Sequence, residues 1–88
     1  MTSNKYDRLQ WFLLERAVSH REISLTLDQI EAIIGASLPA SARKHREWWS
    51  NQSDVSRRAQ ARAWIEAGYK VESVGPKSIV SSVRFIRQ

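Results

Sequence analysis

The stretch over residues 22–35, EISLTLDQIEAIIG, joins a strand pattern directly to a helix pattern. Its first six residues alternate between apolar and polar, which predicts a short strand with one buried face. Thr26 stands three residues before Gln29, and this is the spacing of a capping box at the start of a helix. Helical spacing then continues through Leu27, Ile30, Ile33 and Ile34 to Gly35, a natural helix stop. A strand that turns at once into a helix predicts a mixed α+β domain.

The remaining patterns complete the order of elements. Helices are predicted from a cap at Asn4 to residues 18–20, over residues 42–49 and over residues 53–67, and strands over residues 69–74 and 79–86. We therefore expect a single domain over residues 1–88, with three main helices, a short insert helix and a small antiparallel sheet ending in a hairpin. Without the insert, this is the order of a winged helix-turn-helix. The first strand would pair with the hairpin, residues 53–67 would form the recognition helix, and residues 75–78 would form the wing.

Length and composition exclude several classes of protein. A chain of 88 residues can build one modest core, and the absence of cysteine excludes disulfides, thiolate metal sites and a cysteine nucleophile. No apolar run approaches the roughly 20 residues that span a bilayer, and residues 1–10 carry no signal-like apolar run. We expect a soluble cytoplasmic protein that has no contact with membranes and no cofactor.

Positive charge is concentrated in the middle of the sequence. The whole chain carries a net charge of +5, and residues 39–70 hold seven basic against three acidic residues, which gives +4. Such asymmetry favours a polyanionic partner, although a solvated charged face remains the alternative.

Several motifs resemble one family of small bacterial domains. The shared pattern includes Tyr6-Asp7, Gly35, Leu38-Pro39, Ser41 to Arg46, Trp48-Trp49, Asn51, Gln60 to Trp64, Gly68, Tyr69 and Val71. The sequence departs from the pattern in the arginine-bearing segment QSDVSRR and in a serine-rich final hairpin. No activity is established for this family, so the resemblance implies kinship and no particular function.

The basic segments predict contacts with nucleic acid. Cationic side chains pair with phosphates, and we assign this role to Arg43, Lys44, Arg46 and Lys77, with His45 as a further hydrogen-bond donor. Arginine pairs with guanine, and asparagine or glutamine pairs with adenine. Base edges would be contacted from the start of the recognition helix by Asn51, Ser53, Arg57, Arg58 and Gln60, with Arg62 farther along the same helix. The alternative for each is an ordinary polar exterior.

The four tryptophans divide between core and surface. Trp11 and Trp64 are assigned to the core, whereas Trp48 and Trp49 are adjacent and cannot both lie on one helical stripe. At least one of this pair should be buried, and an exposed indole could stack on a base or seat a protein partner. Neither a zinc site nor a catalytic triad is supported, because the two histidines are isolated and no glycine-flanked nucleophile is present.

These observations favour a non-catalytic DNA-binding domain, either a transcriptional regulator or a targeting module, with double-stranded DNA as its partner. A module this small makes few contacts, which favours a homodimer formed through Trp11 or Leu14 if they are exposed. One alternative is a protein-interaction adaptor built on the tryptophan pair and its basic neighbours. The other is a reader of a modified base through Trp48 or Trp49.

Overall fold

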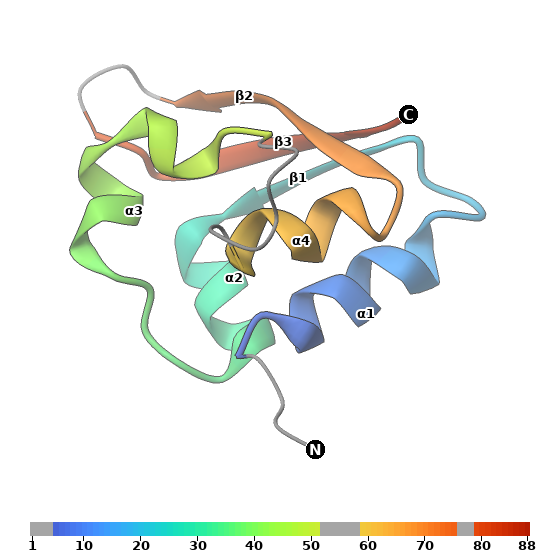
Figure 1. The fold of residues 1–88 in the computed structure, drawn as a ribbon, viewed down its shortest axis with the longest axis horizontal. Coiled ribbons are helices and arrows are strands. Elements are labelled where there is room, and N and C mark those ends of the chain that lie inside the picture. The colour runs from blue at the N-terminus through green and yellow to red at the C-terminus, as the bar shows by residue number, and fades with distance from the viewer. Residues whose placement is uncertain (1–4, 52–58, 76–78) are drawn as a thin grey trace.

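Helices cover one side of a small sheet (Figure 1). The computed structural model describes residues 5–51, 59–75 and 79–88. The elements are α1 (Asp7–Arg16), β1 (Glu22–Thr26), α2 (Leu27–Ile34), α3 (Ala40–Lys44), the 3-10 helix η1 (Arg46–Trp49), α4 (Ala59–Ile65), β2 (Tyr69–Gly75) and β3 (Ser82–Arg87). The prediction of a mixed α+β domain with a three-stranded antiparallel sheet is confirmed. Among the described residues, no helix has the length and apolar character that crossing a membrane requires.

The last strand lies in the centre of the sheet. Its order is β1-β3-β2, so the first strand pairs with the C-terminal one, as predicted. Ile23 pairs with Phe85 and Leu25 with Val83, and all four side chains are buried beneath the helices. The inward face of β1 therefore follows the alternation seen in the sequence.

The register of β2 differs from the sequence expectation. Strict alternation places Ser73 on the face of Tyr69 and Val71, but a bulge between Val71 and Ser73 shifts the register by one residue. Val74 therefore lies opposite Val83 and packs against the core in place of Ser73. A bulge leaves one residue of the strand without a partner in the ladder. That residue is Glu72, whose carboxylate lies 3.3 Å from the Arg84 guanidinium on the neighbouring strand.

The junction between β1 and α2 forms the predicted capping box. The Thr26 backbone N–H donates to the Gln29 side-chain oxygen at 2.8 Å, and the Gln29 backbone N–H donates to the Thr26 hydroxyl at 3.1 Å. Gly35 ends α2 in the left-handed conformation, with φ of 70°, and its N–H donates to the Glu31 carbonyl. The local patterns therefore determined both ends of this helix correctly.

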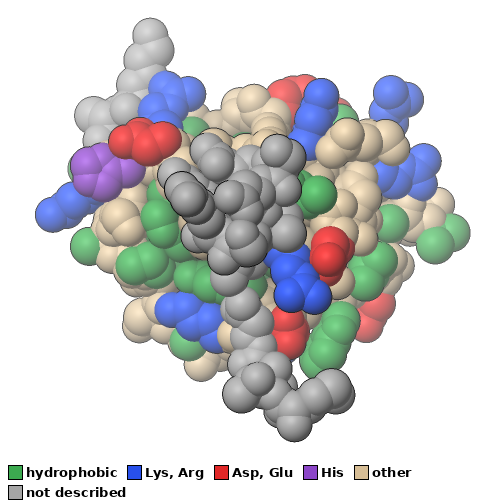
Figure 2. Space-filling model, in the orientation of Figure 1, with side chains coloured by type: hydrophobic (Ala, Val, Ile, Leu, Met, Phe, Trp, Pro, Cys, Tyr) green, Lys and Arg blue, Asp and Glu red, His purple; other side chains and the backbone are tan. Residues whose placement is uncertain are grey.

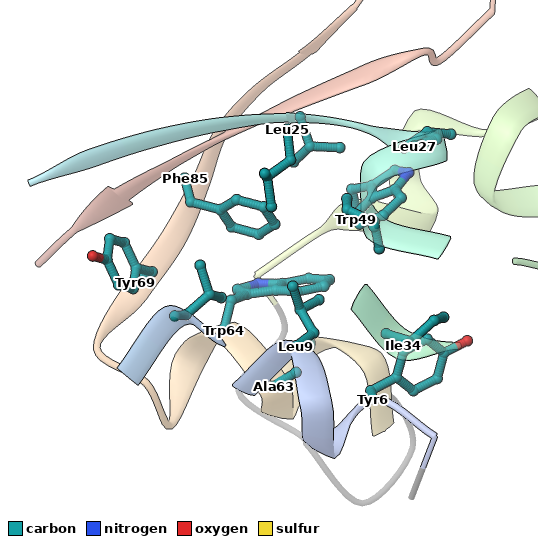
Figure 3. Packing of buried hydrophobic residues seen from close by; sticks show 14 of the residues in the cluster. Tyr6, Leu9, Leu25, Leu27, Ile34, Trp49, Ala63, Trp64, Tyr69 and Phe85 are labelled. Atoms are coloured by element: carbon teal, nitrogen blue, oxygen red, sulfur yellow. The ribbon is translucent and has the colours of Figure 1, made fainter. Parts of the chain in front are cut away.

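A row of aromatic rings crosses the core. Trp49 stacks on Trp64 at a centroid distance of 5.6 Å, and Trp64 contacts Phe85 at 5.8 Å. On the other side, Trp48 meets the edge of Trp49 at 4.6 Å and of Tyr6 at 6.0 Å. Figure 3 shows Trp64 lying between Trp49 and Phe85 on one side and Leu9 and Ala63 on the other. The row joins α1, η1, α4 and β3, so the two tryptophan motifs serve one packing unit.

One predicted helix and one predicted core residue are wrong. The single helix expected over residues 42–49 ends at Lys44, because His45 is extended, with φ of −123° and ψ of 116°, and η1 follows. This break allows the Trp49 indole N–H to donate to the Ala42 carbonyl while its ring stacks on Trp64. Trp11 is 58% exposed and does not belong to the core, because α1 turns Leu9 and Leu13 inward from the opposite face.

Candidate nucleic-acid interface

Three segments that are distant in the sequence meet at one end of the sheet. The backbone N–H of Val80, in the connection that leads into β3, donates to the Arg43 carbonyl of α3 at 2.8 Å. The Gln60 amide of α4 donates to the Trp48 carbonyl of η1 at 3.3 Å. The start of α4, the segment from α3 to η1 and the hairpin end of the sheet are therefore neighbours. These are the segments that the sequence assigned to DNA contact.

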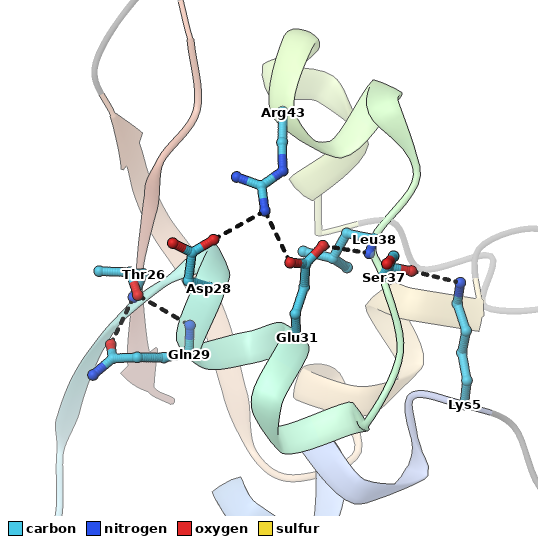
Figure 4. Close-up of polar contacts among 8 residues, drawn as sticks. All are labelled: Lys5, Thr26, Asp28, Gln29, Glu31, Ser37, Leu38 and Arg43. Carbon is cyan, nitrogen blue, oxygen red and sulfur yellow. Dashed lines mark hydrogen bonds and ion pairs between the residues drawn. The ribbon is translucent and has the colours of Figure 1, made fainter.

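Arg43 is held by carboxylates of α2. Its guanidinium lies 3.2 Å from Asp28 and 3.0 Å from Glu31, as Figure 4 shows. The hydrogen bond with Asp28, followed by that with Glu31, raises the pKa of Arg43 above its ordinary value. The second oxygen of Glu31 accepts the Leu38 backbone N–H at 2.7 Å. Arg43 thus ties α3 to α2, and a phosphate would have to compete with two carboxylates for it.

Lys44 and Arg46 differ from Arg43. Both side chains are exposed, and neither forms a hydrogen bond or an ion pair with any described residue. They flank His45, whose imidazole lies 3.7 Å from the Glu47 carboxylate. Two cations without competing partners are therefore carried by the break between α3 and η1.

The described cations do not gather into one patch on the face seen in Figure 2. Lysine and arginine side chains lie at several places around that face, with acidic groups among them. Two further arginines of the described chain form ion pairs within the fold: Arg62 with Glu66 at 2.9 Å, and Arg84 with Glu22 at 2.6 Å. The hydrogen bond with the partner carboxylate is the main cause that raises the pKa of Arg62 and of Arg84. Among the described residues of this region, Lys44 and Arg46 are accordingly the cations without a carboxylate partner.

Asn51 has partners on two elements. Its amide nitrogen donates to the Val71 carbonyl at 2.8 Å, and its oxygen accepts the Val71 backbone N–H at 2.8 Å and the Trp64 indole N–H at 3.0 Å. The side chain therefore pairs with the free edge of β2 much as a neighbouring strand would. Contact with a base stays a prediction for Asn51 and Gln60, and it would require each amide to exchange its present partners.

Four of the predicted contact residues lie outside the described part of the chain: Ser53, Arg57, Arg58 and Lys77. The same holds for the expected start of the recognition helix and for most of the expected wing turn. Their roles stay predictions.

The tryptophan pair divides as its adjacency required. Trp49 is only 2% exposed, so it has no ring face left for a base or a partner. Trp48 is partly buried and lines a hollow of about 230 Å³ together with Ser41, His45 and Glu47. Of these two indoles, Trp48 is therefore the one that could stack on a ligand.

A protein-family profile described as Domain of unknown function (DUF7662) matches residues 6–87. The chain belongs to this family. Neither a curated protein nor a solved structure matches the sequence. The match confirms that these residues belong to a small family of unknown function, whereas the particular motif and the bacterial origin stay predictions.

Much of the sequence pattern in this DUF7662 domain is explained by its core. Tyr6, Trp48, Trp49 and Trp64 belong to the aromatic row, and Asn51 joins that row to β2. The sequence analysis missed this structural role of Asn51, because an asparagine after an aromatic pair carries no local sign of a partner 20 residues away. Among the described residues, no group of three or more His, Asp or Glu side chains is placed to hold a metal ion.

Proposed function

We propose that this DUF7662 domain is a non-catalytic DNA-binding domain. The observation that carries the proposal is the meeting of the α3–η1 segment, the start of α4 and the hairpin end of the sheet, linked by the Val80–Arg43 and Gln60–Trp48 hydrogen bonds. Each of these segments contains or adjoins residues that the sequence assigns to DNA contact. Their proximity would let them contact one duplex together.

The topology supports a winged-helix mode of binding. A strand order of β1-β3-β2, with α4 leading directly into the β2–β3 hairpin, is the arrangement expected of that class. The helix that precedes the hairpin would then enter the major groove by its N-terminal end. Arg57 and Arg58, which precede α4 in the sequence, would supply guanidinium groups that pair with guanine.

Lys44 and Arg46 would contact the phosphate backbone. Both are exposed and have no carboxylate partner among the described residues, so binding a phosphate would break no ion pair of the fold. Arg43 would instead hold α3 in position through Asp28 and Glu31. The neutralisation of phosphates releases counterions, which makes the affinity strongly dependent on salt.

A pair of charge-matched variants tests the proposal. Lys44→Gln with Arg46→Gln removes two cations at the proposed interface. The control, Arg21→Gln with Lys70→Gln, removes two exposed cations at the opposite end of the sheet, where β1 and β2 begin. Affinity for a DNA duplex of random sequence would be measured by filter binding or calorimetry from about 50 to 200 mM salt, the range over which phosphate contacts weaken strongly.

The two variants should differ in their salt dependence. Each lost phosphate contact lowers the slope of log affinity against log salt by about 0.9, so the interface variant should lose about 1.8 and the control almost nothing. Equal effects of the two variants, or no affinity of the original protein at low salt, would overturn the proposal. The second result would favour an adaptor for an acidic protein.

The hollow beside Trp48 supports a second candidate, a reader of a modified or unpaired base. An indole face and a neighbouring carboxylate can stack on a base and accept a hydrogen bond from its amino group. The hollow has the residues for both, Trp48 and Glu47. Competition between plain and methylated duplexes distinguishes the candidates, because the reader should prefer the modified one and lose that preference in Trp48→Leu.

A further inference from the structure

The outer face of α1 carries large apolar side chains that no described residue covers. Trp11 is 58% exposed, Leu14 is 44% exposed, and Val18, just after the helix, is 88% exposed. Trp11 and Leu14 lie three residues apart and form one apolar stripe on α1, opposite the buried Leu9 and Leu13, and Val18 follows in the turn after the helix. Ile79 completes the large exposed hydrophobics of the described residues and lies in the connection between β2 and β3. Clustered apolar residues of this kind mark a surface that binds another molecule.

Two opposite charges accompany the stripe. Arg8 and Glu15 are seven residues apart, so they lie on the same flank of α1, and both are exposed. Within the described ranges, Glu15 has a single distant ion pair, with Arg16 at 3.9 Å, and its side chain remains 78% exposed. The stripe thus has a positive group beside one end and a negative group beside the other.

This pattern is complementary to itself in one orientation. When two copies of the helix pack antiparallel about a two-fold axis, the same flank of each faces the other with its direction reversed. Arg8 then comes beside Glu15 of the second copy, and the same pair forms again on the other side of the axis. A parallel packing about a two-fold axis would instead place this flank of each helix beside the opposite flank of the other, so Arg8 and Glu15 would not pair.

We propose that α1 binds α1 of a second copy of this chain in an antiparallel two-fold dimer. Trp11 of each copy packs against Leu14 of the other, and the Arg8–Glu15 pairs set the orientation. The inference does not depend on the proposed function. Each copy contributes one helix of about 15 Å, which buries less surface than the roughly 800 Å² per partner of a standard interface. The dimer is therefore weak, with an expected dissociation constant of roughly 0.1 mM.

Sedimentation equilibrium tests the dimer. The protein concentration would range from about 0.01 to 1 mM, which brackets the expected dissociation constant. The original chain should move from its monomer mass of 10.2 kDa to twice that mass. Trp11→Gln with Leu14→Gln should remain a monomer throughout, with an unchanged far-ultraviolet circular dichroism spectrum because both side chains are exposed. Ile79→Gln is the matched control and should dimerise like the original. A monomer at every concentration, as expected if another protein covers this face, overturns the inference.

A charge exchange tests the antiparallel orientation. Arg8→Glu alone and Glu15→Arg alone should each weaken dimerisation several-fold, because each brings like charges together twice. The double variant restores both pairs with reversed polarity and should recover the original dissociation constant. A double variant as weak as the single ones would overturn the two-fold arrangement, since only that arrangement places these two positions beside each other.

Discussion

The replacement of Asn51 by alanine should destabilise the domain more than its exposed position suggests. The amide accepts the indole N–H of Trp64 and pairs with both backbone groups of Val71. Trp64 is fully buried, so its N–H has no ready access to water once Asn51 is shortened. The two Val71 groups lie at the free edge of β2 and can be hydrated in part.

The magnitude follows from these three bonds. A buried donor without a partner costs about 1 to 3 kcal/mol, and each bond to Val71 contributes about 0.5 to 1 kcal/mol net. The total loss is about 2 to 5 kcal/mol, a large part of the roughly 5 to 10 kcal/mol by which a domain of this size is stable. At about 4 to 8 °C per kcal/mol, the melting temperature should fall by at least about 8 °C.

Urea unfolding followed by circular dichroism measures the effect. Asn51→Asp is the matched variant, because it keeps the acceptor for both N–H groups and loses only the donor to the Val71 carbonyl, so its loss should be smaller. Ser24→Ala, at an exposed position of β1, should change the free energy of unfolding by less than about 0.5 kcal/mol. If Asn51→Ala also changes the free energy of unfolding by less than about 0.5 kcal/mol, the amide does not hold η1, α4 and β2 together.

Two further predictions concern backbone conformation and pH. Gly35→Ala should lower the free energy of unfolding by about 1 kcal/mol, because Gly35 has φ of 70° and an added Cβ would lie 3.1 Å from the Arg8 guanidinium. Gly75→Ala is the control. Because the space around Gly75 is open, this variant should be nearly neutral in the same urea assay. Burial raises the pKa of Tyr69 above its ordinary value of 10.0, although Arg87 and Arg16 oppose the shift. Its contribution to stability is therefore present below pH 10 and is lost as the pH rises through the folded-state pKa. Between pH 9 and 11, roughly, Tyr69→Phe should lose stability less steeply than the original chain, and equal slopes would contradict this account.

Features that depend on neighbours in the sequence were predictable. The capping box of Thr26 and Gln29 and the left-handed Gly35 follow from spacing alone, because the groups involved lie within one or two helical turns. The pairing of β1 with β3 also followed, since the alternation in each strand left one buried face to share.

Features that depend on distant partners were not predictable in the same way. The helix break at His45 is determined by the fit of Trp49 against Trp64, and the bulge at Glu72 accompanies its approach to Arg84. Helix propensity and strand alternation are local properties of the sequence, so they do not reveal a contact with Trp64 or Arg84.

The candidate interface was predictable in its chemistry and less so in its geometry. The basic residues after Ser41 were identified correctly as a charged segment, but only the structure separates Arg43, held by Asp28 and Glu31, from Lys44 and Arg46, which have no such partner. Charge is a property of each residue, whereas its availability depends on the residues that folding brings beside it.

The separation of the four indoles gives the protein a built-in optical reporter. Trp49 stacks on the buried Trp64 and meets the partly buried Trp48 at its edge, while Trp11 on α1 is 58% exposed to water. Emission should therefore contain a red component that iodide quenches and a blue component that it does not reach. Because only the first would change colour when a second molecule covers α1, self-association and unfolding can be followed as two distinct spectral events in one sample.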